Sequence, residues 1–196
     1  LVATEYINIE KEANITSRSL VDTPIKRLRV GMKISVYQLL FPLLQESSNE
    51  AAESIALLYG RGAFIKHMNT KAKAIGMTNT VFVDPTGVGS GNVSTPEDLF
   101  MLAKYIYNNR SFLFGITSGK IKTSTYGKSI FTDLSAANEF TGQPNFFGGI
   151  SEETTTGGSN NFSVFTISTS GKDRPIFFLS LNSKNSKKDI TNAIEY

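Results

Sequence analysis

The segment LLFPLLQESSNEAA, residues 39–52, contains a short polar junction between two helical patterns. Before the junction, apolar residues recur every three or four positions, which is typical of a helix with one buried face. This stripe consists of Val36, Leu39, Leu40, Leu43 and Leu44. Pro42 is expected to kink the helix, and a second helix is predicted from Asn49 to Gly60. Residues 47–49, Ser-Ser-Asn, therefore lie where one predicted helix ends and the next begins.

Further elements follow this pair of helices. A third helix is predicted from about Arg61, with Gly76 in the left-handed conformation that ends many helices. A short β-like run at 80–83 and a surface loop at 84–93 come next. Residues 95–98, Thr-Pro-Glu-Asp, are a typical helix start, because threonine caps the first turn and the acids lie at the positive end of the helix dipole.

The last third of the chain predicts an antiparallel sheet. Residues 162–170 and 174–182 read as two strands, joined into a hairpin by the turn-forming residues 170–173. The second strand carries apolar residues on both faces, which indicates a strand inside a sheet that helices cover on at least one face. Residues 189–194 predict a final helix.

These patterns predict an α+β fold in one domain, residues 1–196. We expect a helical lobe at residues 35–110 and a sheet lobe formed by residues 1–34 and 115–196. The cleft between the two lobes is the expected place of a functional site.

The composition excludes several kinds of site. The chain has no Cys and a single His, His67, which excludes disulfides, thiol nucleophiles and zinc sites built from several imidazoles. The net charge is only +3, so we expect no nucleic-acid partner, and the basic cluster at 26–29 is expected to be a solvated edge. No stretch approaches the roughly 18 consecutive apolar residues that cross a membrane, so no membrane anchor is visible in these residues.

Four segments carry a family resemblance: residues 39–52, 68–77 (MNTKAKAIGM), 80–87 (TVFVDPTG) and 93–99 (VSTPEDL). In this order they resemble the serine-type D-alanyl-D-alanine carboxypeptidases, penicillin-binding enzymes that trim peptidoglycan stem peptides and share a fold with class A β-lactamases. The resemblance implies an antiparallel sheet flanked by helices, beside a helical lobe. It also implies an extracytoplasmic bacterial protein whose partner is a peptidoglycan stem peptide or a β-lactam. Acylation and deacylation in this family need no metal or cofactor.

The resemblance assigns roles to Ser47 and Asn49. In this family a Ser-x-x-Lys motif supplies the nucleophile and its base, because a serine hydroxyl is a weak nucleophile until a base takes its proton. The Ser of a Ser-x-Asn motif relays protons, and its Asn orients the substrate amide. Ser47 would then be the relay and Asn49 the orienting group. Without the resemblance, both residues read as caps of a helix junction.

The chain departs from the family at the nucleophile. No Ser in this chain is followed three positions later by Lys. Leu1–Glu5 resembles the stretch just after the family's nucleophile, so we expect the Ser-x-x-Lys motif to lie upstream of Leu1. Thr70 and Lys73 have the right spacing, but they fall on the third predicted helix, where the family has no nucleophile. These 196 residues alone are expected neither to hydrolyse D-Ala-D-Ala nor to be acylated by penicillin.

A second departure concerns the family's Lys-Thr-Gly motif, whose lysine and hydroxyl receive the carboxylate of the substrate. Here Ile150, Ser151 and Glu152 take its place, and a register one residue later gives Ser151, Glu152 and Glu153. A charge-assisted hydrogen bond contributes about 1.5–3 kcal/mol. Two like charges about 4 Å apart repel by about 4 kcal/mol at an effective dielectric constant of about 20. We therefore expect carboxylate-bearing substrates to bind poorly. The sequence Lys-Thr-Ser at 122–124 is a possible substitute, but it lies on a different predicted strand.

Three functional hypotheses remain open. The first is an enzyme whose N-terminal part lies outside these residues and whose carboxylate pocket has diverged. The second is a catalytically inactive relative, a pseudoenzyme that binds peptidoglycan or a partner protein, favoured by Ile150, Ser151 and Glu152. The third is a β-lactamase-like hydrolase, disfavoured because residues 84–98 offer only Glu97 as a deacylating acid.

Overall fold

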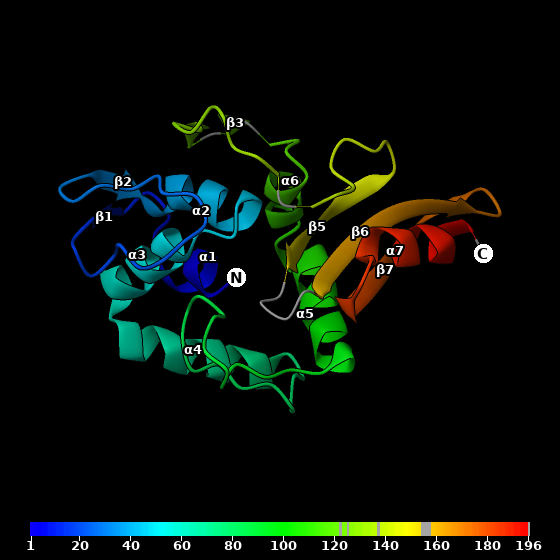
Figure 1. The fold of residues 1–196 in the computed structure, drawn as a ribbon, viewed down its shortest axis with the longest axis horizontal. Coiled ribbons are helices and arrows are strands. Elements are labelled where there is room, and N and C mark those ends of the chain that lie inside the picture. Colours follow the sequence, from blue (N-terminus) through cyan, green and yellow to red (C-terminus); the bar gives the residue numbers. More distant parts are fainter. Residues whose placement is uncertain (122, 125, 137, 154–157, 196) are drawn as a thin grey trace.

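A computed structural model of the chain describes residues 1–121, 123–124, 126–136, 138–153 and 158–195. Its helices are α1 (Val2–Tyr6), α2 (Val36–Gln45), α3 (Asn49–Tyr59), α4 (Arg61–Ala74), α5 (Pro96–Asn109), α6 (Phe112–Thr117) and α7 (Ser186–Glu195). Its strands are β1 (Glu12–Asn14), β2 (Lys33–Ser35), β3 (Thr123–Ser124), β4 (Gly127–Lys128), β5 (Phe146–Glu153), β6 (Ser159–Thr169) and β7 (Lys172–Ser183). The predicted α+β class is confirmed, with α2–α4 on one side of the molecule and the sheet β5–β7 on the other (Figure 1).

Side-chain caps explain where three of the helices begin. The hydroxyls of Ser35, Ser48 and Thr95 each accept a hydrogen bond from the backbone N–H three residues later, at 3.2–3.3 Å. Such a bond satisfies one of the N–H groups that a helix start leaves unpaired. The predicted starts of α3 and α5 are therefore confirmed, and the left-handed Gly76 follows α4 as expected.

The main core is formed around α2. Its apolar stripe is buried or half-buried as predicted, and Pro42 lies inside the helix. Residues 1–34 also pack here: β1 pairs with β2 and contacts α3, and α1 contacts α4. In the described contacts, this segment thus lies with the helical lobe and not with the sheet lobe expected from the sequence, because β1 pairs with β2, which leads directly into α2.

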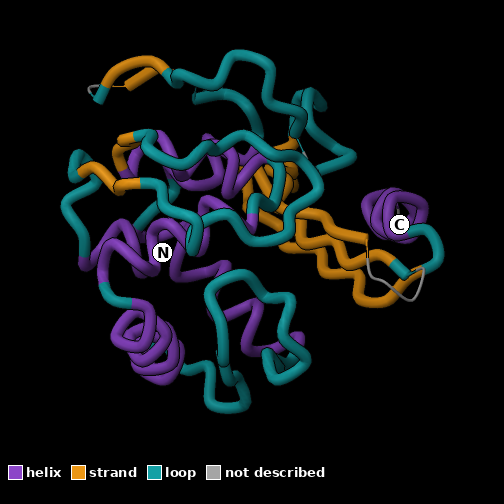
Figure 2. The backbone as a smooth tube through the Cα atoms, turned by 60° about the vertical axis from the view of Figure 1, so that its left-hand side comes forward, coloured by secondary structure: helices purple, strands orange, loops and turns teal. Residues whose placement is uncertain are grey.

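The sheet has the order β5-β6-β7, and all its pairs are antiparallel. The predicted hairpin is confirmed as β6 and β7, joined through Ser170 and Gly171, whose positive φ values of 53° and 75° suit a tight hairpin turn. Figure 2 shows α7 alone on one side of this sheet, with the helical lobe on the other. Among the described residues β7 is an edge strand, so the expectation that it lies inside the sheet is wrong. Its apolar residues on both faces are explained by contacts with α7 and α5.

The β-like run at 80–83 does not become a strand. Val81 and Val93 form one isolated bridge, with hydrogen bonds of 2.9 and 3.0 Å. The next two N–H groups along the run donate to side chains of Asn69 and Asn92 (2.9 and 3.0 Å). Because side chains take these backbone groups, no ladder extends from the bridge.

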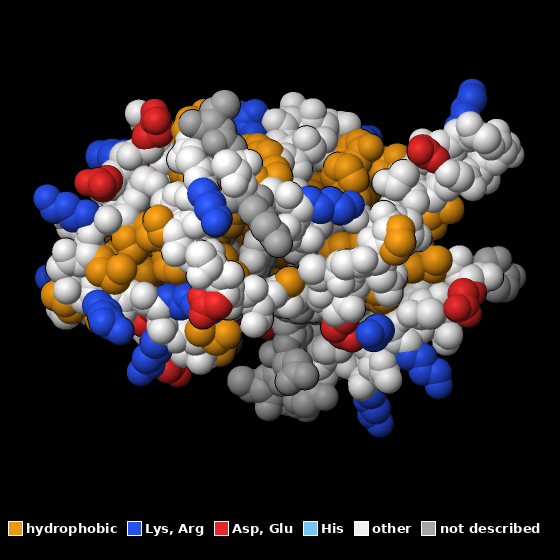
Figure 3. Space-filling view, turned by 90° about the horizontal axis from the view of Figure 1, so that it is seen from above, with side chains coloured by type: hydrophobic (Ala, Val, Ile, Leu, Met, Phe, Trp, Pro, Cys, Tyr) orange, Lys and Arg blue, Asp and Glu red, His pale blue; other side chains and the backbone are white. Residues whose placement is uncertain are grey.

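The surface carries no segregated charge on the face seen from above. Figure 3 shows basic and acidic side chains scattered there among apolar groups. Of the helices in the described part of the chain, none combines the length and the apolar character needed to span a membrane.

Candidate functional site

Ser47 lies in the turn between α2 and α3. Its φ of +52° is in the left-handed region, which is uncommon for serine. The turn is closed by hydrogen bonds from the N–H groups of Glu46 and Ser48 to the carbonyl of Pro42, both 3.1 Å. Ser47 is half-buried, and its hydroxyl makes no hydrogen bond to the described residues. This hydroxyl is therefore uncommitted and can both donate and accept a proton.

Asn49 is the first residue of α3, and two of its hydrogen-bonding groups already have partners. Its Nδ2 donates to the carbonyl of Asp22 at 2.8 Å, and its backbone N–H donates to the hydroxyl of Thr23 at 3.3 Å. A carboxamide offers two N–H donors and a carbonyl acceptor. Asn49 thus retains one donor and its acceptor for a ligand, within the described part of the chain.

Ile150, Ser151 and Glu152 lie on β5, at an edge of the described sheet. They pair with Phe162, Asn161 and Asn160 of β6, in that order. Ile150 is 38% exposed and Glu152 is exposed, whereas Ser151 is buried. Because side chains alternate along a strand, Ile150 and Glu152 share one face and Ser151 points to the other.

Helix α6 connects the two halves of the candidate site. On one side, Gln45 Nε2 at the end of α2 donates to the carbonyl of Ile116 at 2.9 Å. On the other, the N–H of Gly149 donates to Thr117 Oγ1 at 3.0 Å. No hydrogen bond joins Ser47 or Asn49 directly to β5 among the described residues, so α6 sets the spacing between them.

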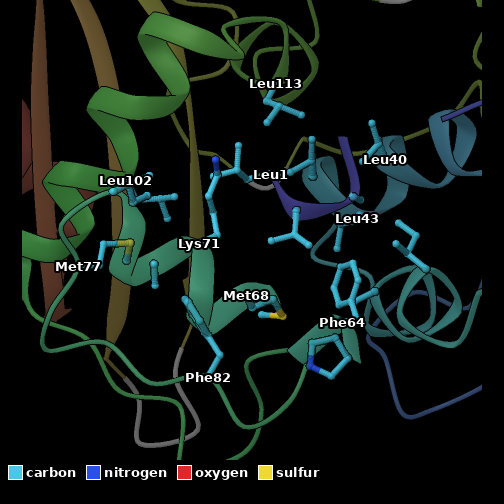
Figure 4. Close-up of a pocket in the computed structure, with 18 residues that line it drawn as sticks. Leu1, Leu40, Leu43, Phe64, Met68, Lys71, Met77, Phe82, Leu102 and Leu113 are labelled. Carbon is cyan, nitrogen blue, oxygen red and sulfur yellow. The ribbon is translucent and has the colours of Figure 1, made fainter. Parts of the chain in front are cut away.

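An apolar cavity of about 190 Å³ lies beside this region. Figure 4 shows it between α1, α2, α4 and α5. The labelled residues that line it are Leu1, Leu40, Leu43, Phe64, Met68, Lys71, Met77, Phe82, Leu102 and Leu113. Among the described residues of this lining, Lys71 has the only charged side chain.

The Lys71 ammonium group is already paired. It lies 2.5 Å from Glu5 Oε2 and 2.9 Å from the hydroxyl of Tyr105, which donates to Glu5 Oε1 at 2.9 Å. Burial would raise the pKa of Glu5, but the hydrogen bonds from Lys71 and Tyr105 outweigh burial and hold this pKa below its ordinary value. The same bonds raise the pKa of Lys71 against burial. Lys71 is therefore a charged structural group and not a free base.

The remaining sequence candidates fall at the surface or outside the described residues. Thr70 and Lys73 are exposed on α4, and Glu97 is exposed in the first turn of α5. Lys122 lies outside the described residues, and its neighbour Thr123 is in the separate β3–β4 hairpin. His67 is half-buried between Tyr6, whose ring is tilted against it at 4.6 Å, and Tyr59, whose ring meets it edge-on at 5.4 Å.

Arg27 and Glu46 are features of the site that the sequence analysis missed. The basic cluster at 26–29 was expected to be solvated, but the Arg27 side chain is only 14% exposed and pairs with Glu46 at 2.5 Å. Glu46 immediately precedes Ser47, so the acid beside the motif was the available signal, and its burial is visible only in the structure. Its partner lies 19 residues earlier, and the helical pattern carries no information about such pairing.

The sequence of the chain is similar to those of D-alanyl-D-alanine peptidases. A family model for D-alanyl-D-alanine carboxypeptidase matches residues 2–184. The chain is 50% identical over 78 residues to D-alanyl-D-alanine endopeptidases of Pseudomonas aeruginosa and Escherichia coli, which is 39% of this chain and 25% of each relative. It is 39% identical over 94 residues to a D-alanyl-D-alanine carboxypeptidase of a Streptomyces strain, which is 43% of this chain and 32% of the relative. The matched segments thus span a third or less of these relatives.

Solved structures show the same fold. A D-alanyl-D-alanine carboxypeptidase of Mycobacterium tuberculosis superposes with a TM-score of 0.74 at 22% identity, over 91% of this chain and 69% of that chain. A mutant DD-transpeptidase of Streptomyces gives 0.74 at 24% identity, over 99% and 82%. A penicillin-binding protein of Listeria monocytogenes with bound cefotaxime gives 0.72 at 23% identity, over 96% and 76%. With the family match extending from residue 2 to residue 184, the chain belongs to the D-alanyl-D-alanine carboxypeptidase family.

Proposed function

We propose that the protein acts on D-alanyl-D-alanine peptides of bacterial peptidoglycan outside the cytoplasm, with Ser47 as proton relay and Asn49 as the group that orients the peptide amide. The observation that carries this proposal is the uncommitted Ser47 hydroxyl in a constrained turn, two residues before Asn49. The named activities of the relatives and the bound cefotaxime of a structural neighbour support the same ligand class.

The chemistry of the two side chains suits these roles. A hydroxyl without a fixed partner can accept a proton on one side while it donates one on the other, which a relay requires. The remaining donor and acceptor of Asn49 match the C=O and N–H of one peptide group. Acylation needs a nucleophile with an adjacent base, and no Ser of this chain has Lys at the family's spacing. Residues 1–196 alone are accordingly proposed to bind the ligand without cutting it.

A non-catalytic binding role is the second candidate, and β5 favours it. Ile150 and Glu152 share the exposed side of the strand, where the family has a lysine that receives a carboxylate. A terminal carboxylate at this edge would be repelled by Glu152, and the apolar Ile150 supplies no compensating positive charge. The preferred ligand of the site would then be a peptide whose terminal carboxylate is blocked or absent.

Two measurements on the 196-residue chain test these proposals. Intact mass spectrometry after incubation with penicillin is expected to show no covalent adduct, and a stoichiometric adduct would overturn the non-cutting proposal. Titration calorimetry should compare an acetylated Lys-D-Ala-D-Ala peptide with its C-terminal amide. We expect the amide to bind more tightly. Binding of neither peptide would contradict the assignment of ligand class, and tighter binding of the free acid would contradict the role given to Glu152.

A further inference from the structure

The backbone of Ser47 needs a constraint from its surroundings. A left-handed conformation costs a non-glycine residue about 1–2 kcal/mol. Such conformations persist only where neighbouring structure over-determines them. The hydrogen bonds to the Pro42 carbonyl lie within the α2–α3 segment. Contacts with other segments of the chain must therefore supply any further constraint on the turn.

Glu46, the residue before Ser47, is anchored from outside the turn. The Glu46 side chain is 1% exposed, and its carboxylate accepts hydrogen bonds from Nε and Nη2 of Arg27, each at 2.5 Å. The N–H of Ser135 donates to the same carboxylate at 3.1 Å. A two-pronged arginine–carboxylate pair fixes orientation as well as distance, because both groups are planar. The turn is therefore held at Glu46 by a rigid and buried contact.

The segment around Arg27 also holds the residues after Ser47. The N–H groups of Arg27 and Leu28 approach Glu50 Oε2 at 3.4 and 3.3 Å. The carbonyl of Asp22 accepts from Asn49. Residues 22–28 thus contact the turn on both sides of Ser47.

Arg27 reaches a third segment as well. Its Nη1 lies 2.9 Å from Asp133 Oδ1, and its Nη2 donates to the Asp133 carbonyl at 3.1 Å. The neighbours of Asp133, Thr132 and Leu134, line a second cavity of about 470 Å³, and Gln45 lies in the same lining. One guanidinium therefore links the Ser47 turn to the segment that contributes Thr132 and Leu134 to a neighbouring cavity.

We propose that Arg27 is the positioning residue of the Ser47–Asn49 turn, acting through Glu46 and holding the turn against residues 133–135. Its effect on a ligand rests on the proposed function of Ser47 and Asn49, whereas its effect on the turn does not. Hydrogen bonding to Glu46 raises the pKa of Arg27 further above its ordinary value, so the guanidinium stays charged.

A second arginine–glutamate pair serves as the control. Arg61 Nε pairs with Glu53 Oε1 at 2.7 Å, and the Glu53 side chain is 7% exposed. The Arg61 side chain is 45% exposed and makes this one contact among the described residues, so the pair is more solvated than Arg27–Glu46. A variant at Arg61 therefore reports the cost of losing an arginine–glutamate pair on α3 that does not involve Glu46.

The experiment compares Arg27→Gln, Glu46→Gln, Arg27→Lys and Arg61→Gln in the 196-residue chain. Amide hydrogen exchange of residues 47–50 is measured beside thermal unfolding and affinity for the D-Ala-D-Ala peptide amide. We expect Arg27→Gln and Glu46→Gln to speed amide exchange at residues 47–50 at least tenfold. We also expect them to lower the affinity for the peptide amide by about tenfold, the scale of one charge-assisted hydrogen bond. Arg27→Lys should recover part of both effects, because a lysine keeps the charge without the fork. Arg61→Gln should change neither.

Two outcomes would overturn the proposal. One is unchanged exchange at residues 47–50 in both Arg27→Gln and Glu46→Gln. The other is an equal acceleration in Arg61→Gln, which would show a loss of stability only. If Arg27→Gln does not fold, Glu46→Gln and Arg27→Lys decide by the same exchange criterion. Absence of peptide binding in the unaltered chain would refute the proposed function, and the exchange measurement would still decide the role of Arg27.

Discussion

The left-handed turn at Ser47 makes a prediction that does not depend on any ligand. Glycine adopts this conformation without the steric cost that a Cβ imposes, whereas alanine keeps the cost and loses the hydroxyl. We expect Ser47→Gly to be more stable than Ser47→Ala by about 1 kcal/mol, as measured by urea unfolding. Both variants remove the relay hydroxyl.

Loss of a hydroxyl alone is measured at Ser48, because Ser48 caps α3 in the extended conformation. There the side chain accepts the cap hydrogen bond from Ala51 N–H and no left-handed strain is present. Ser48→Ala should cost about 0.5–2 kcal/mol. Equal stability of the two Ser47 variants would show that the turn relaxes out of the left-handed region.

At the scale of an element, the loop at 84–93 is organised by one carboxylate. Asp84 accepts from the N–H groups of Thr86, Gly87 and Gly89 and from the side chains of Thr86 and Asn92, at 2.7–2.9 Å. Burial alone would raise the pKa of Asp84, but these hydrogen bonds outweigh it and hold the pKa well below its ordinary value. The loop therefore depends on an ionised Asp84.

This shift predicts the direction of a pH dependence. A carboxyl group whose pKa is lowered by folding stabilises the protein above its ordinary value of about 4, and this contribution is lost as the pH falls through the lowered value. Asp84→Asn should cost about 1–3 kcal/mol at about pH 7 and progressively less below about pH 4. Denaturant unfolding at several pH values measures the cost and its pH dependence. Glu10→Gln, at an exposed position, is the control. A cost that stays constant with pH would contradict the assignment.

The contact between α6 and β5 makes a second prediction at this scale. A Cβ on Gly148 would lie 2.6 Å from the carbonyl oxygen of Phe114, which is closer than such atoms approach. Gly148→Ala should push β5 away from α6 and cost about 1–3 kcal/mol. Gly62→Ala in α4 meets no atom within 4 Å and should instead stabilise by about 0.5–1 kcal/mol. Urea unfolding compares the two, and equal effects would refute the spacer role of α6.

At the scale of the whole molecule, the sequence predicted what local signals determine. The cap at Thr95 and the turn within residues 170–173 were readable because each is decided within a few residues. The edge position of β7 and the pairing of Arg27 with Glu46 were not, because both depend on residues far apart in the chain. Ser47, Asn49 and Ile150 could be named from motif spacing, but spacing does not reveal that α6 separates them.

Under the proposed function, that separation makes ligand preference depend on both lobes. A peptide held at Ser47 and Asn49 would extend toward β5, where Ile150 is 38% exposed and an added cation can remain solvated. We expect Ile150→Lys to tighten binding of a peptide with a free terminal carboxylate by about tenfold relative to its amide, the scale of a charge-assisted hydrogen bond. Ile150→Gln, of similar size without charge, should leave the ratio of the two affinities unchanged.

Salt dependence separates charge from shape in this comparison. Attraction between exposed charges is screened over about 10 Å at 0.1 M salt and over about 3 Å at 1 M. The advantage of the free acid in Ile150→Lys should therefore shrink as salt is raised, whereas a change in the shape of the edge would persist. Equal tightening of acid and amide by Ile150→Lys would mean that β5 does not meet the end of the peptide. The carboxylate would then be received elsewhere, and Ile150 and Glu152 would not explain a preference for blocked peptides.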